Sequence, residues 1–126
     1  MKIKFFFDRV YRIQVLFISG CSWKEANKAF AKKTKLPSLP DDHFSELGVT
    51  YLLTEEDFPS KIKGTVGFIW VRKKIDLGTL THELCHLVIG VLDKKAGMEI
   101  NSVTSEAFAY YYDFWLKTIW LFINEK

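Results

Sequence analysis

Apolar residues alternate with polar ones along residues 9–16, a pattern that is typical of a half-buried β-strand. The phenylalanines at residues 5–7 belong either to an earlier strand or to the same one. Two further apolar runs, residues 49–54 and 64–71, have the length and composition of strands. The pattern therefore predicts a sheet of three or four strands.

The strand expected over residues 64–71 contains Gly67, and a glycine inside a strand often marks a bulge or a close approach of another segment. Two interpretations are open. If this strand lies at the edge of the sheet, its free backbone groups could hold an extended peptide by strand addition. Alternatively, Gly67 is a small residue beneath a bulky neighbour.

Three longer segments repeat apolar residues every three or four positions, as amphipathic helices do. Each follows a residue whose side chain can cap a helix N-terminus, and in the first segment Glu25 completes the pattern of a capping box. The expected caps are Ser22, Asp76, and either Asn101 or Ser102. The expected helices cover residues 23–35, 77–94 and 103–122.

The helix expected over residues 77–94 is apolar around most of its circumference, so we expect it to be buried on two sides. One apolar stripe should pack on the sheet. Gly90 lies toward the opposite side, where the absence of a side chain would let a second helix approach closely.

Together these elements predict an α+β fold in one domain, residues 1–126. The length and the 48% hydrophobic content suit a single packed core. We expect an antiparallel sheet that packs against helix 77–94. Helix 103–122 is expected on the other side of that helix, with helix 23–35 flanking the sheet.

The termini and cysteines point to a cytoplasmic protein. The charged residues around the short apolar run at residues 5–7 leave no room for the core of a signal peptide. No segment has the length of uncharged apolar sequence that a membrane span needs, so no membrane partner is expected. Cys21 and Cys85 are expected to be free thiols.

Five lysines lie on the polar face of the helix at residues 23–35. A solvated helix face is the favoured interpretation, since no arginine or aromatic residue is interleaved with them, and nucleic acid is not the expected partner. In the following loop, His43 comes after Asp41 and Asp42. An ordinary loop histidine is favoured there over a metal ligand, because built sites usually stand on rigid elements.

The residues from His82 to His86 carry the most specific chemical pattern in the chain, His-Glu-Leu-Cys-His. Positions i and i+4 share one face of a helix, so both imidazoles can reach one metal ion. Glu83 lies about 100° around the helix, where it cannot easily be a third ligand but can reach a water on the same ion. This arrangement is typical of a metal-dependent hydrolase. Cys85 is interpreted as a small buried apolar residue.

The last predicted helix has an aromatic face and a more polar face. Glu106 stands in its first turn, and Tyr110, Asp113 and Lys117 follow along the same side at helical spacing. We expect the aromatic face to join the core, and it is large enough to leave a homodimer interface open. A carboxylate on the other face has a reason to be there if that face meets the metal.

The pattern from His82 to His86, followed by Glu106, resembles the gluzincins, zinc metallopeptidases in which a glutamate on a following helix completes the site. The order of strand, helix, loop and glutamate helix over residues 64–115 also resembles the minimal zincin core. The chain is most similar to small metallopeptidase-like proteins encoded by phages and prophages. The resemblance implies one Zn²⁺ held by the two histidines and Glu106, Glu83 as general base, and a peptide or protein substrate.

The chain departs from that family in two respects. Tyr110 stands where thermolysin-type enzymes have an aspartate that supports a ligand, and Tyr110 and Asp113, one turn further on, are the candidates for this supporting role. No oxyanion-stabilising residue can be chosen among the tyrosines at 110–112. The first alternative function is a non-catalytic structural or interaction protein with a structural zinc. The second is a basic protein associated with nucleic acid.

Overall fold

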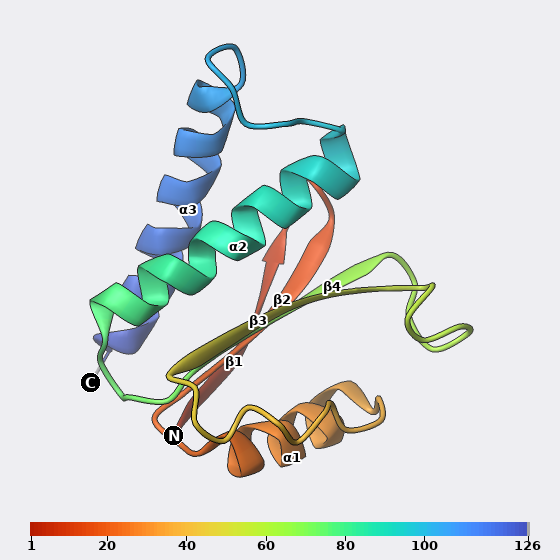
Figure 1. The fold of residues 1–126 in the computed structure, drawn as a ribbon, viewed down its shortest axis with the longest axis vertical. Helices are drawn as coiled ribbons and strands as arrows, with labels where there is room; N and C mark the ends of the chain where they lie inside the picture. The colour runs from red at the N-terminus through yellow and green to blue at the C-terminus, as the bar shows by residue number, and fades with distance from the viewer. Residues whose placement is uncertain (126) are drawn as a thin grey trace.

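A four-stranded sheet forms the centre of the computed structural model, which describes residues 1–125 (Figure 1). The strands, in chain order, are β1 (Lys2–Asp8), β2 (Ile13–Ser19), β3 (Gly48–Thr54) and β4 (Thr65–Val71). Their order across the sheet is β1-β2-β4-β3. The expected α+β class is confirmed. The sheet is mixed rather than antiparallel throughout, because β2 and β4 run parallel, while the β1–β2 and β3–β4 pairs are antiparallel.

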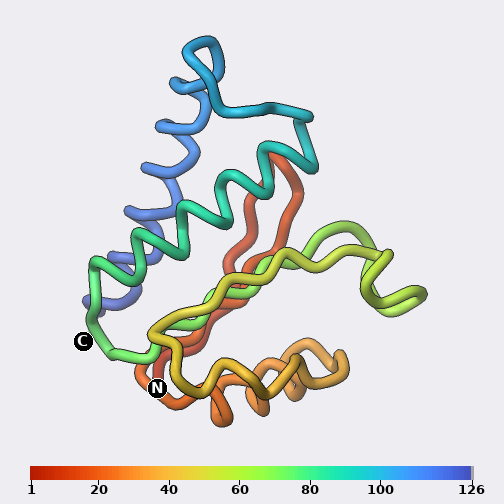
Figure 2. The backbone as a smooth tube through the Cα atoms, viewed as in Figure 1, coloured from red at the N-terminus to blue at the C-terminus, as the bar shows by residue number. Residues whose placement is uncertain are grey.

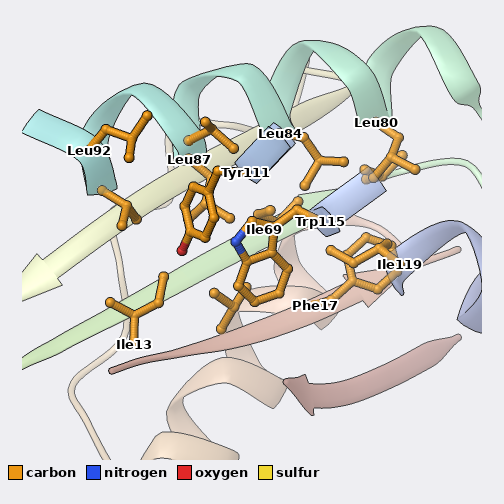
Figure 3. Close-up of a cluster of buried hydrophobic side chains, with 14 of the residues drawn as sticks. Ile13, Phe17, Ile69, Leu80, Leu84, Leu87, Leu92, Tyr111, Trp115 and Ile119 are labelled. Carbon is orange, nitrogen blue, oxygen red and sulfur yellow. The ribbon is translucent and has the colours of Figure 1, made fainter. Parts of the chain in front are cut away.

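The helices cover both faces of this sheet (Figure 1). They are α1 (Trp23–Thr34), α2 (Leu77–Ala96) and α3 (Ser105–Ile123). Helices α2 and α3 lie side by side on one face, and α1 lies on the other. The expectation that α3 lies on the far side of α2 is therefore wrong. Both helices contribute side chains to one cluster with the sheet, as Figure 3 shows.

The helix N-termini form as predicted in two of three cases. Ser22 Oγ accepts a hydrogen bond from the Glu25 backbone N–H and Glu25 Oε1 accepts one from the Ser22 N–H, which is a complete capping box. Asp76 accepts from the Thr79 N–H. The cap predicted for α3 is wrong, because this helix begins after Thr104. Asn101 instead accepts from the backbone N–H groups of residues 103 and 104 and closes the preceding turn.

Gly67 lies in an interior strand, so the interpretation of its strand as a peptide-docking edge is wrong. β4 is paired on both sides, with β2 and with β3. A Cβ atom on Gly67 would lie 2.9 Å from Leu87 Cδ1 and 3.1 Å from Val15 Cγ2. The glycine therefore lets α2 pack directly on the middle of the sheet, as the second interpretation of the sequence proposed.

The Gly67→Ala substitution is expected to destabilise the protein by about 1–3 kcal/mol, the usual cost of adding a methyl group to a filled core. Chemical denaturation would measure this change. The double variant Gly67→Ala/Leu87→Ala should lose less stability than the sum of its single changes, because removing the leucine side chain makes room for the new methyl group. Strictly additive losses would contradict the packing. Gly78→Ala is the matched control, since its Cβ would come no closer than 3.7 Å to a neighbouring atom.

Within residues 1–125, no helix has the length and apolar character needed to cross a membrane. Cys21 and Cys85 are both free thiols, as predicted. Cys21 is buried, and burial raises the pKa of its thiol. Cys85 is only half-buried, so its packing is looser than the sequence suggested.

Candidate metal centre

His82 and His86 lie one turn apart in the first half of α2, and their side chains converge. Their Nε2 atoms are 3.2 Å apart. Two ligand atoms at about 2.0–2.1 Å from a tetrahedral zinc ion lie about 3.3 Å from each other. The spacing of the two donor atoms therefore fits a single zinc ion, as the spacing of the histidines in the sequence implies.

The histidine side of α2 is open. His82, His86 and Ile89 are all exposed, so the prediction that this helix is buried on two sides is wrong. The reason is the placement of α3, which packs beside α2 on the sheet and leaves the histidine side uncovered. Gly90 does admit a close neighbour, but that neighbour is β3 rather than a second helix. A Cβ on Gly90 would lie 3.1 Å from Leu52 Cδ2.

The Glu83 carboxylate lies between α2 and β3, because it contacts the Thr50 hydroxyl of that strand. The backbones of the two elements are drawn in Figure 2, α2 in green to teal and β3 in yellow. Only 7% of Glu83 is exposed. The hydroxyl of Thr50 donates to Glu83 Oε1 at 2.7 Å and also lies 3.0 Å from the carbonyl oxygen of the same residue. One carboxylate oxygen is therefore held in place by the edge strand. The sequence did not point to Thr50.

A second glycine allows this close approach of strand and helix. A Cβ on Gly48 would lie 2.6 Å from Thr79 Cγ2 and 3.0 Å from Glu83 Cγ. Gly48 and Gly90, which have no side chains, lie at the two ends of the contact between β3 and α2. The position of Glu83 is thus fixed by two backbone approaches that only glycine permits without rearrangement.

The cleft between β3 and α2 contains a cavity of about 500 Å³. Its lining includes His82, Glu83 and His86 from the helix and residues 48–52 from the strand. An adjoining cavity of about 460 Å³ continues toward Gly78 and also touches the first two of these helix residues. The two imidazoles and the buried carboxylate therefore face one continuous, solvent-accessible cleft.

His43 lies at the rim of the same cleft, where its ring contacts several other side chains of the protein. Its Nε2 lies 2.7 Å from the Tyr51 hydroxyl and its Nδ1 lies 3.0 Å from Glu46 Oε1. Its ring packs edge-on against Trp23, with centroids 5.0 Å apart. Both ring nitrogens of this loop histidine therefore have partners within the protein.

The loop over residues 35–47 between α1 and β3, which we call the rim loop, is fixed by a residue that the sequence interpretation missed. Asn27, on the buried side of α1, donates to the Leu39 carbonyl oxygen at 2.7 Å and accepts from the Leu39 N–H at 2.8 Å. Arg72 holds the next part of the loop by donating to the Glu46 carbonyl oxygen at 2.8 Å. An asparagine on the apolar face of a predicted helix was the available indication, because buried amides need partners.

Glu106 is not brought to the histidines. It lies on the exposed side of α3, whereas the buried side carries Tyr111, Trp115 and Ile119. Among residues 1–125, no three His, Cys, Asp or Glu side chains lie close enough together to hold a metal ion. The two candidate supporting residues share the exposed side of α3: Tyr110 is exposed, and Asp113 pairs with Lys117 at 2.9 Å.

The hydroxyl groups of two tyrosines fix which side of α3 faces the core. The Tyr111 hydroxyl donates to Asp8 Oδ2 at 2.7 Å, and the Tyr112 hydroxyl donates to the Thr81 carbonyl oxygen at 3.1 Å. Burial raises the pKa of Tyr111 far above its ordinary value and also raises that of Tyr112, so both phenols stay protonated as donors. Because these residues point inward, Glu106 points outward. The aromatic face of α3 forms part of the core, as predicted.

Comparisons of the chain with protein-family models, with curated proteins and with solved structures found no match. What the site does is therefore inferred from its own geometry.

Proposed function

We propose that the protein is a zinc-dependent peptide hydrolase whose active site is the cleft between α2 and β3. One observation carries the proposal: two imidazole nitrogens converge to 3.2 Å beside a buried carboxylate that faces the same cavity. Zinc held by His82 and His86 would lower the pKa of a bound water and polarise a carbonyl group. Exposed histidines at the mouth of a cleft suit a catalytic site better than a structural one, because structural zinc sites are closed by four ligands.

Glu83 is the proposed general base. Its carboxylate takes a proton from the attacking water and passes it to the nitrogen of the leaving amine, so that the carboxylate is regenerated when the peptide bond breaks. Thr50 holds Oε1 and leaves the second carboxylate oxygen for the water. Burial of Glu83 and its hydrogen bond to a strand keep this group in one orientation, which favours proton transfer over a defined path.

The edge strand β3 is the proposed support for the substrate. Within the described residues it pairs only with β4, so its other edge has no strand partner, although the backbone groups of Thr54 at its end bond to Asp57 and Phe58. None of its seven residues is charged. Uncharged, unpaired edges of this kind bind extended peptides by adding a strand. A peptide bound in this way would run along the cleft past Glu83.

His82 and His86 would supply two ligands to a zinc ion, one fewer than the three protein ligands that are usual in catalytic zinc sites. We therefore expect calorimetry to find zinc binding that His82→Ala or His86→Ala abolishes. Glu106→Gln should leave the zinc affinity unchanged, because this side chain points away from the pair. His43→Gln is the matched control, since it removes the third imidazole without removing either proposed ligand.

The zinc affinities of these variants distinguish a site made of His82 and His86 alone from one that also includes Glu106. A large loss of zinc affinity in Glu106→Gln would mean that the metal-loaded protein rotates α3 and uses the third ligand that the gluzincin resemblance implies. Zinc binding that survives loss of both His82 and His86 would contradict the proposed site altogether.

A further inference from the structure

The exposed side of α3 has a regular pattern of its own. Glu106, Tyr110, Asp113 and Lys117 follow one another at intervals of four, three and four residues, and together they form what we call the α3 outer face. This spacing places them in one line along the helix, as in the contact seam of paired helices. In Figure 1 α3 runs along the left border of the molecule, and all four residues are exposed. The α3 outer face is therefore accessible to a second molecule.

Large apolar side chains continue this line at both ends and in the middle. Val103 precedes the helix and is 88% exposed, Leu121 near its end is 70% exposed, and Tyr110 between them is 74% exposed. Beside Tyr110, an apolar hollow of about 350 Å³ is bordered by Val10 and Phe114, which are exposed as well. The exposed apolar surface formed around this hollow by Val10, Tyr110 and Phe114 is of the kind that commonly marks a contact with another protein.

When the α3 outer face meets the same face of a second copy that runs in the opposite direction, opposite charges lie across from each other. In an antiparallel arrangement centred between residues 111 and 112, Glu106 of one copy lies opposite Lys117 of the other. The Tyr110 phenol, a hydrogen-bond donor, then lies opposite the carboxylate of Asp113. At the ends, Val103 lies opposite Trp120 of the other copy, one residue from Leu121. Each level thus brings together groups that attract, and the two-fold axis makes every pairing occur twice.

A parallel arrangement has the opposite property. In register, it would place Glu106 beside Glu106 and Lys117 beside Lys117 of the other copy, and like charges at such distances repel. We therefore propose that the α3 outer face is the interface of a homodimer in which two α3 helices pack antiparallel. This interface does not involve the histidine pair and does not depend on the proposed hydrolase function.

Charge reversal tests the proposal. Sedimentation velocity over a wide range of concentrations should find a reversible dimer for the natural chain. Lys117→Glu should raise the dimer dissociation constant by about tenfold, because it creates two repulsive pairs in each dimer. Glu106→Lys should act similarly. The double variant Glu106→Lys/Lys117→Glu should dimerise as the natural chain does, because the complementary charges are restored in exchanged positions.

Lys28→Glu reverses an exposed charge on α1 and is the matched control, expected to leave the dissociation constant unchanged. Circular dichroism would confirm that each variant is folded. A natural chain that stays monomeric at every concentration would overturn the proposal. So would a dimer that Lys117→Glu does not weaken, or a double variant that remains as weak as the single ones.

Discussion

Glu83→Gln is expected to lower the rate of peptide cleavage by about 10²–10⁴-fold, the usual contribution of a positioned general base. The amide has nearly the shape of the carboxylate and its oxygen can still accept from Thr50, so the cleft should keep its form. An amide cannot take a proton from water at neutral pH, which removes the proposed step. A pool of quenched fluorescent peptides would measure the rate, and calorimetry should find zinc binding unchanged.

Two further variants make this expectation specific. Thr50→Val removes the hydroxyl that holds the Glu83 carboxylate and should lower the cleavage rate by a smaller factor than Glu83→Gln, because the base remains but is less well oriented. Glu46→Gln changes a carboxylate at the rim of the same cavity and should leave the rate intact. Cleavage that persists in Glu83→Gln at the natural rate would show that another group acts as base.

Trp115→Ala should destabilise the protein by about 3–5 kcal/mol, as expected for the loss of a fully buried indole. Trp115 lies between the sheet and α2 (Figure 3) and packs edge-on against Phe6, with ring centroids 6.4 Å apart. Its removal would open a cavity between two layers that cannot collapse onto each other easily. Urea denaturation followed by circular dichroism would measure the change.

Phe44→Ala provides the comparison, because it deletes an aromatic ring that is 75% exposed on the rim loop. The free energy of unfolding should change by no more than about 0.5 kcal/mol in that variant. Equal losses in the two variants would mean that Trp115 does not occupy the buried position described above.

The local features of the fold were predictable because they depend on neighbouring residues. The capping box at Ser22 and the cap at Asp76 each involve groups three residues apart, and both form. The pairing of β2 with β4 was not predictable in this way. Alternation of apolar residues looks the same in parallel and antiparallel strands, and which strand lies at the edge depends on contacts between residues far apart in the chain.

The features of the site that depend only on the geometry of α2 were predictable from the sequence. The convergence of His82 and His86 follows from helix geometry alone, and so does the separate direction of Glu83. The place of Glu106 depends on which face of α3 enters the core. The aromatic face does so, because burying Tyr111 and Trp115 removes far more apolar surface from water than any use of the polar face would. The contact of Thr50 with Glu83 was not predictable, because it depends on which strand lies at the edge of the sheet beside α2.

The parallel pairing of β2 with β4 also has a consequence for how the chain folds. The sheet consists of two hairpins, β1–β2 and β3–β4, each made of strands that follow one another in the chain with no helix between them and therefore able to form from local contacts. The central pair can form only after the segment containing α1 has been closed into a loop, at an entropic cost. We therefore expect docking of the two preformed hairpins to limit the folding rate, and mutations at the β2–β4 contact to slow folding more than mutations within either hairpin.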